Sequence, residues 1–153
     1  MHKNKSCMRL IDKPGLHGCL RFTVYKGGVP IEKFEDNNLI TSGARLQMAH
    51  LIAGDALDRS INRIAVGTNG NVPTVSDTEI TNSFIKPVEG FEYPENGQVQ
   101  INWKLEVGEA NGKEIREFGL LTTDGTLFAR RIRNTPIHKE SDISIEGEWI
   151  IIF

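Results

Sequence analysis

The chain has 153 residues, of which 39% are hydrophobic and 25% charged, and its formal net charge is -2. A chain of this length and composition folds as one ordinary domain and needs neither a metal nor a disulfide to do so. The near-neutral charge argues against a nucleic-acid-binding protein, and no apolar run approaches the roughly 18 residues of a membrane span.

Residues 1–37 are expected to form an N-terminal arm and a hairpin, a candidate oligomerisation or attachment element. A strand at Cys19–Lys26 precedes the turn signal Gly27-Gly28 and a second extended run from Ile31. Residues before about 13 are expected to fray. Because Met1–Ser6 is followed by no apolar segment, we expect no signal peptide and synthesis in the cytoplasm.

Cys7 and Cys19 are the only cysteines, and their spacing of twelve differs from that of a CxxC metal or redox pair. We interpret both as reduced, structural residues. A disulfide between them stays open as an alternative if the protein functions outside a cell.

The sequence predicts one short helix near residues 42–54, with Thr41 or Ser42 as the N-cap and Gly54 at the end. The apolar residues at helical spacing are Leu46, Ala49, Leu51 or Ile52, and Ala53. The remaining face, with Arg45, Gln47 and His50, is expected to contact water or a neighbouring subunit.

From Ile61 onward the chain alternates strand-like runs with tight turns. Ile64–Val66 precedes a glycine-rich turn at Gly67–Asn71, and Gln98–Val107 alternates apolar and polar residues throughout. Trp103 belongs to its apolar side and is expected in the core. Hairpin-type turn signals recur at Asn96-Gly97, Asn111-Gly112 and Asp124-Gly125.

Ile115–Leu121 and Thr126–Ile132 are predicted to form a hairpin, and Ile143–Phe153 is the last predicted strand. The apolar end Ile150–Phe153 would aggregate as a free tail, so it must be paired in a sheet and covered on both faces. The predicted fold is therefore mostly β, an antiparallel β-sandwich with a barrel as second choice, plus the one short helix near residues 42–54.

No motif of catalysis, cofactor binding or metal binding is present, so we predict no enzyme, no cofactor, no metal and no site residues of these kinds. His2, His17, His50 and His138 are widely separated. The glycines of Gly67–Gly70 indicate a turn, not a phosphate loop, and His17 beside Cys19 does not indicate a reactive thiol. The carboxylate pairs are best explained by solvated strand faces; they are Asp77 with Glu79 and Glu114 with Glu117.

Arg130, Arg131 and Arg133, with Lys139 nearby, form the one local concentration of charge. On a strand, Arg130 would share a face with Ile132, opposite Arg131 and Arg133. These arginines either protect an edge or surface strand by their charge or pair with carboxylates across a subunit boundary.

The order of several segments resembles a phage tail protein module. Its first half corresponds to Asn38–Leu46, Leu51–Gly54, Ile64–Thr68, Pro73 and Ser76–Thr78. Its second half corresponds to Asn111-Gly112, Ile115–Leu120, Gly125–Arg130, Ile137–Lys139 and Trp149–Phe153. The resemblance covers roughly residues 38–153, which we take as a β-sandwich tail-protein module that follows the N-terminal arm.

This resemblance implies a structural protein of the virion tail of a phage or prophage, associated with a tail fibre or baseplate and made in the bacterial cytoplasm. It also implies other phage tail proteins as partners and a homo-oligomer, expected as a trimer or hexamer. Neither nucleic acid nor membrane insertion is expected.

Two other functions stay open. A small carbohydrate-binding module or receptor-binding tip would bind a host-surface glycan through exposed aromatic residues; Tyr25 and Tyr93 are available, whereas Trp103 and Trp149 fall on apolar faces. A hydrolase built from distant carboxylates is the third candidate.

Overall fold

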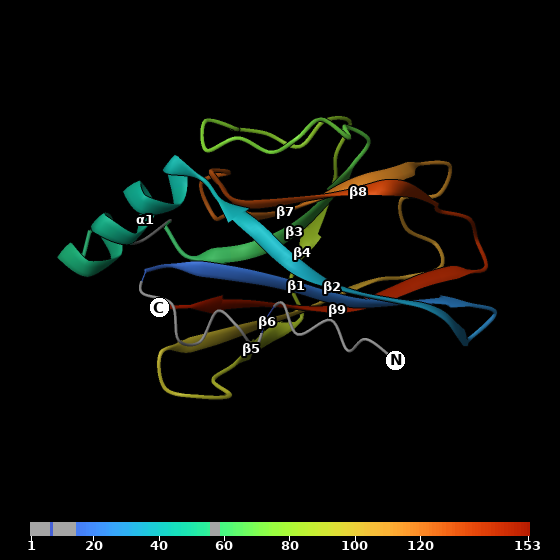
Figure 1. Ribbon diagram of the computed structural model, residues 1–153, viewed down its shortest axis with the longest axis horizontal. Helices are drawn as coiled ribbons and strands as arrows, with labels where there is room; N and C mark the ends of the chain where they lie inside the picture. Colours follow the sequence, from blue (N-terminus) through green and yellow to red (C-terminus); the bar gives the residue numbers. More distant parts are fainter. Residues whose placement is uncertain (1–6, 8–14, 56–58) are drawn as a thin grey trace. The chain divides into compact units, whose positions relative to one another are not determined.

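The computed structural model describes residue 7, residues 15–55 and residues 59–153 (Figure 1). In these residues the chain forms nine strands and one helix. They are β1 His17–Lys26, β2 Val29–Ile40, α1 Ser42–Ala53, β3 Ile61–Gly67, β4 Phe84–Pro87, β5 Gly90–Glu92, β6 Gln98–Leu105, β7 Glu114–Thr122, β8 Leu127–His138 and β9 Ile143–Ile152. Every strand pairing is antiparallel. The predicted fold class, antiparallel and mostly β with one short helix, is confirmed. The described part of the chain contains no helix that is both long and apolar enough to span a membrane.

The chain forms two compact units, each assembled from segments that are distant in sequence. Unit 1 contains residues 1–38, 88–112 and 139–153, and unit 2 contains residues 39–87 and 113–138. This division differs from the expected boundary after residue 37, because β1 pairs along its whole length with β9. The frayed start expected before residue 13 lies outside the described residues, apart from Cys7.

The strands of unit 1 follow the order β2-β1-β9-β6-β5. One face of this sheet is apolar, because the alternating residues of β1, β6 and β9 point to the same side. The buried residues of this face include Leu20, Phe22, Val24, Ile101, Trp103, Leu105, Ile145 and Trp149. Phe22 stacks on Phe34 with ring centroids 4.9 Å apart and meets Trp103 edge-on. The predicted core positions of Trp103 and Trp149 are confirmed.

The last strand, β9, lies between β1 and β6, as its apolar composition requires. Ile150, Ile151 and Ile152 are all buried, so the prediction of a paired and covered terminal strand is confirmed for them. Phe153 follows the end of the strand and is 62% exposed, so the prediction is wrong for this residue.

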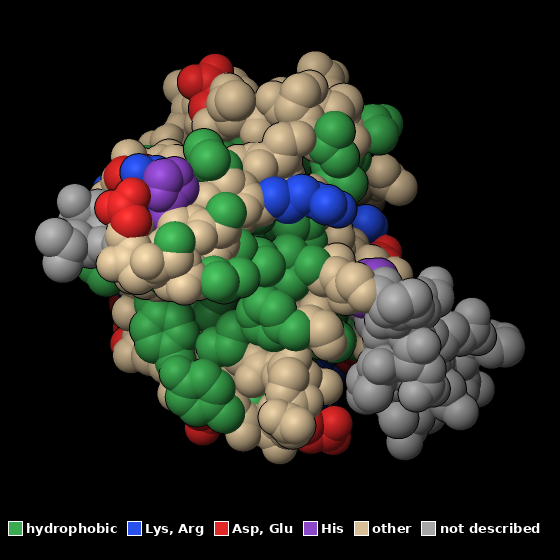
Figure 2. Space-filling model, turned by 90° about the vertical axis from the view of Figure 1, so that its left-hand side faces the viewer, with side chains coloured by type: hydrophobic (Ala, Val, Ile, Leu, Met, Phe, Trp, Pro, Cys, Tyr) green, Lys and Arg blue, Asp and Glu red, His purple; other side chains and the backbone are tan. Residues whose placement is uncertain are grey.

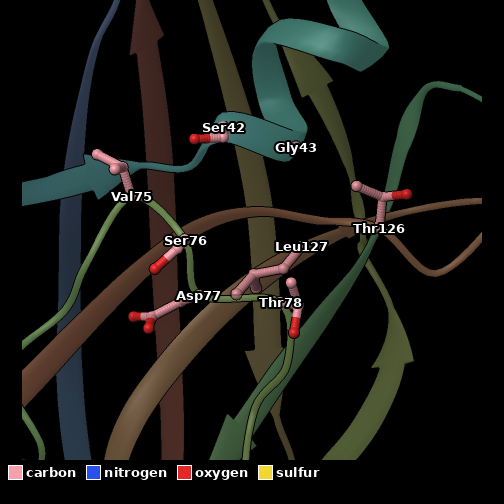
Figure 3. A pocket seen from close by; sticks show the side chains of 8 residues that line it. All are labelled: Ser42, Gly43, Val75, Ser76, Asp77, Thr78, Thr126 and Leu127. Carbon is pink, nitrogen blue, oxygen red and sulfur yellow. The ribbon is translucent and has the colours of Figure 1, made fainter.

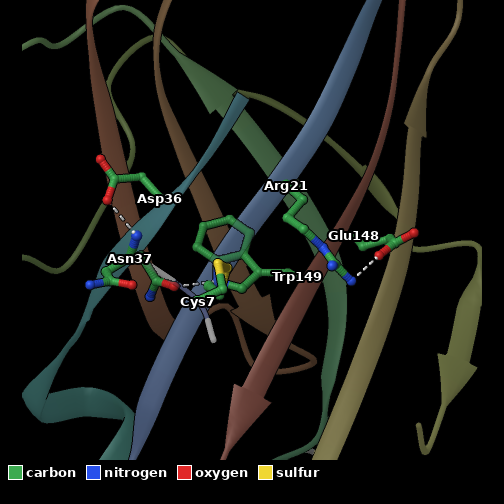
Figure 4. Close-up of a disulfide and its surroundings, with 8 residues drawn as sticks. Cys7, Arg21, Asp36, Asn37, Glu148 and Trp149 are labelled. Atoms are coloured by element: carbon green, nitrogen blue, oxygen red, sulfur yellow. Dashed lines mark hydrogen bonds and ion pairs between the residues drawn. A yellow bond between two sulfur atoms is a disulfide. The ribbon is translucent and has the colours of Figure 1, made fainter. Parts of the chain in front are cut away.

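Cys7 and Cys19 form a disulfide in unit 1, with their Cα atoms 5.6 Å apart (Figure 4). The interpretation of both cysteines as reduced is therefore wrong, and the alternative left open is the one observed. β1 places Cys19 on the sheet face opposite Leu20, and Cys7 meets it there. A side-chain hydrogen bond also links β9 to β2 across the intervening β1, since Trp149 Nε1 donates to Asn38 Oδ1 at 2.7 Å.

Unit 2 contains the strand order β4-β3-β7-β8, and the end of β2 pairs with β8. β7 and β8 form the predicted hairpin around Asp124-Gly125, where Gly125 has a φ of +88°. The Asn111-Gly112 turn, in contrast, joins β6 and β7, which do not pair. Its Gly112 N–H donates instead to the carbonyl of Lys139.

Helix α1 has the predicted ends, and Arg45 is exposed as expected, but the residues that it buries are not the predicted ones. The Thr41 hydroxyl caps the first turn by accepting the Ala44 N–H, and Gly54 ends the helix in the left-handed conformation. Gln47, which was expected to meet water or another subunit, is fully buried, whereas Leu46 and Ile52 are 56% and 85% exposed. The predicted apolar contact face is wrong, because hydrogen bonds of Gln47 hold this helix in place.

Candidate functional site

Arg130 lies at the centre of a buried ionic network in unit 2. Its side chain is 2% exposed, and its Nε donates to Glu117 Oε2 at 2.7 Å. Its Nη1 donates to Asp77 Oδ2 at 3.0 Å. Neither expectation for Arg130 holds: it neither protects a strand surface nor pairs across a subunit boundary, because both carboxylates belong to the same chain.

The same network fixes the segment between β3 and β4. Arg130 also donates to the carbonyls of Asn69 and Asn71, each at 3.0 Å. Glu117 Oε1 accepts the backbone N–H groups of Thr81 at 2.7 Å and of Asn69 at 3.2 Å. Since β7 carries Glu117 and β8 carries Arg130, these two side chains fasten residues 69–81 to the sheet.

Two glycines make room for this arrangement. A Cβ on Gly67 would lie 2.6 Å from Glu117 Oε1 and would also clash with the carbonyl oxygen of Thr81. A Cβ on Gly119 would lie 2.6 Å from Ile80 Cγ1. The close contacts therefore give both positions a steric reason to lack a side chain.

A small pocket of about 240 Å³ adjoins the network (Figure 3). Its lining consists of Ser42, Gly43, Val75, Ser76, Asp77, Thr78, Thr126 and Leu127. Burial raises the pKa of Asp77, but hydrogen bonds from Thr74 and Arg130 outweigh this and lower it. The only acid in the lining is thus held ionised by structural partners, and the volume is below the roughly 300–1,000 Å³ of most ligand pockets.

Hydrogen bonds also attach α1 to the β7–β8 hairpin within unit 2. Gln47 Nε2 donates to Thr122 Oγ1 at 3.0 Å and to Asp124 Oδ1 at 2.7 Å, and Arg59 donates to Gln47 Oε1 at 2.9 Å. The hydrogen bonds from Thr122 and then Gln47 hold the pKa of Asp124 far below its ordinary value. Asp124 is therefore an anionic anchor for the helix.

Lys139 belongs to unit 1, whereas the arginines with which its sequence position grouped it belong to unit 2. Its side chain is 1% exposed, and its Nζ donates to Asn111 Oδ1 at 2.8 Å and to the carbonyls of Val107 and Glu140. Burial lowers the pKa of this amine. The three acceptors come from two loops, so Lys139 joins them.

The other candidate groups are distributed over the two units. His50 contacts Asp55 at 2.9 Å, and His138 lies 3.5 Å from Glu114. Glu117, which was paired with Glu114 in the sequence, is buried against Arg130, and Glu79 is exposed. The ligand atoms of Cys7, Cys19 and Glu35 lie within 4.8 Å of one another, but the two sulfur atoms are joined as a disulfide.

A polar cluster lies on β5 and β6 of unit 1, beside an exposed aromatic residue. Gln100 Nε2 donates to Glu92 Oε2 at 2.7 Å and to Asn102 Oδ1 at 2.9 Å, and Asn102 Nδ2 donates to Glu92 Oε2 at 3.3 Å. Tyr93 follows Glu92 directly and is 79% exposed, whereas Tyr25 is half-buried. Of the two predicted candidates, Tyr93 thus offers the larger free surface.

No family model, curated protein or solved structure gives a significant match to the chain. The hydrogen bonds of Arg130 and Glu117 hold the segment between β3 and β4 against β7 and β8.

Proposed function

We propose that this chain is a structural protein of a phage or prophage tail, associated with a tail fibre or baseplate, that acts through protein–protein contacts. The observation that carries the proposal is the meeting of Asp77, Glu117 and Arg130 in one buried network. These residues come from three separate segments that resemble the tail module. Their joint use in fastening a loop supports an architectural role for the resemblance as a whole.

The surface of the chain also supports assembly. Large hydrophobic side chains are exposed in both units, and they include Val29, Ile31, Leu46, Ile52, Val72 and Val75. Exposed apolar side chains of this kind become buried when a partner protein covers them. A tail component that contacts its own copies and other tail proteins covers such residues on assembly.

Co-expression with the proteins encoded beside its gene tests this function. We expect the chain to co-purify with at least one tail protein and to form a homo-oligomer in size-exclusion chromatography with light scattering. The Arg130→Met variant is expected to be less stable and to give less of the complex, whereas Arg116→Met, at a half-exposed position, keeps both its stability and the complex. A chain that stays monomeric at high concentration and binds none of these proteins would overturn the proposal.

Glycan binding is a second candidate, favoured by the position of Tyr93 beside the cluster of Glu92, Gln100 and Asn102. The exposed ring of Tyr93, the residue after Glu92, offers a stacking surface, and the fixed amide and carboxylate groups of the cluster offer hydrogen-bonding partners. Glycan-array binding that is lost in Tyr93→Ala and kept in Ile31→Ala would support this candidate. An array without any bound glycan would dismiss it.

A further inference from the structure

The apolar side chains of helix α1 face solvent, whereas a surface helix normally buries its apolar side chains. Leu46, Leu51 and Ile52 are 56%, 40% and 85% exposed, and Ala49 and Ala53 are exposed as well. Figure 2 views the molecule from the side on which α1 lies in Figure 1, and hydrophobic side chains are visible on this surface. The helix needs none of them for its own attachment, because Gln47 and the Thr41 cap provide it.

The exposed residues form a line along the helix. Leu46, Ala49 and Ile52 are three residues apart, a spacing that places side chains on the same side of a helix. Ala49, which has the smallest side chain, lies in the middle of this line, and the larger Leu46 and Ile52 lie at its ends. Two such helices in antiparallel orientation come close at Ala49, and Leu46 of each then faces Ile52 of the other.

The charges at the two ends of α1 follow the same symmetry. Arg45 is exposed in the first turn, and Asp55 is exposed just beyond the last turn, with 76% of its side chain accessible. An antiparallel pair brings Arg45 of one copy toward Asp55 of the other, on both sides of the contact. A parallel pair would instead place like charges together and align the two helix dipoles unfavourably.

We propose that α1 is a self-association element that packs against α1 of a second copy of this chain, antiparallel about a twofold axis through Ala49. The proposal rests on the proposed function, since it names one contact of the homo-oligomer, and of the two expected states a twofold contact fits the hexamer and not a lone trimer. A helix of 12 residues is about 18 Å long. Its pairing buries less than the roughly 1,200–2,000 Å² of a stable interface, so it adds to other contacts and forms a weak dimer alone.

Cross-linking tests the position of the axis. A residue on a twofold axis meets its own copy, so Ala49→Cys is expected to give a covalent dimer when a dithiol-oxidising reagent such as diamide is added. Leu46→Cys is expected to cross-link to Ile52→Cys when the two variants are mixed, and only weakly to itself. Asn134→Cys, at an exposed position of β8, serves as the control for random collisions.

Charge reversal tests the orientation. Arg45→Asp and Asp55→Arg are each expected to weaken the dimer in sedimentation velocity, and an equal mixture of the two variants is expected to restore it, because both contacts become attractive again. Both changes are compatible with the helix dipole, because Arg45→Asp places a negative charge in the first turn and Asp55→Arg places a positive charge after the last turn. Circular dichroism spectra of both variants that match the spectrum of the parent chain verify that the variants are folded.

An Ala49→Cys dimer yield no higher than that of Asn134→Cys would overturn the pairing, as would charge variants that sediment like the parent chain. If the chain still co-purifies with tail proteins in that case, only the α1 contact fails and the proposed function stands. If it neither pairs nor co-purifies, both are wrong.

Discussion

Arg130 and Glu117 form an ion pair that is almost wholly withdrawn from solvent: Nε and Oε2 are 2.7 Å apart, and the side chains are 2% and 0% exposed. Burying two charges costs desolvation energy, which is recovered only when each has excellent partners. Here Arg130 has Asp77 and two carbonyls in addition, and Glu117 has two backbone N–H groups. Removing one partner leaves the other charge buried without compensation.

Arg130→Met is therefore expected to lower the free energy of unfolding by about 3–5 kcal/mol, measured by urea denaturation. Glu117→Gln is expected to cost a similar amount, and the double variant less than the sum of both. Arg116→Met, which disturbs only a half-exposed side chain 3.9 Å from Glu114, serves as the control and should change stability little. Additive losses would contradict the coupling of Arg130 to Glu117.

The two glycines beside the network are expected to tolerate no side chain. Gly67→Ala and Gly119→Ala force Glu117 or Ile80 to move, so each should cost about 1–3 kcal/mol of unfolding free energy. Gly90→Ala is the matched control, because no atom lies within 4 Å of the added Cβ. Equal melting temperatures of all three variants would argue against this packing.

Reduction of the Cys7–Cys19 disulfide should destabilise the chain. The bond closes a loop with a sequence separation of 12, for which about 3 kcal/mol is expected from the loss of chain entropy in the unfolded state. Thermal melts with and without dithiothreitol measure the effect. The reductant should leave Cys7→Ser unaffected; an equal shift in both proteins would show that the effect has another source.

Acid should weaken the attachment of α1. The pKa of Asp124 in the folded chain lies far below the ordinary value of 3.8, so its ionised form contributes stability above that value and loses it progressively as the pH falls further. The free energy of unfolding, measured against pH, should therefore decline in this acidic range. Asp124→Asn is expected to be less stable near neutral pH and to show a shallower decline. An identical pH profile would exclude Asp124 from this effect.

The sequence was sufficient to predict those features that depend on only a few neighbouring residues. The Thr41 cap, the Gly54 stop and the alternation in Gln98–Leu105 each act over a few residues, and each prediction was confirmed. The strand ends two residues earlier than predicted, however, and Val107 is exposed. The residue at which a strand ends depends on how far the neighbouring strand continues to form hydrogen bonds with it.

The candidate site could not be assembled from the sequence for a different reason. Glu117 and Arg130 are 13 residues apart and Asp77 is 53 residues from Arg130, so only the strand register brings them together. The charged run around Arg130 looks like a solvated strand until its partners are known. For α1, the regular spacing of apolar residues was read as a buried face, whereas the buried face consists of Ala44 and Gln47.

The way in which α1 is attached also determines how it detaches. Directional bonds from Gln47 fix the rotation of the helix about its axis, but they bury little apolar area and lose their strength over a short displacement. In hydrogen exchange, the amides of α1 should therefore open at a lower free energy than those of β7 and β8 and form a separate exchanging segment. We therefore expect the helix to leave its place on the sheet while the Arg130 network stays closed.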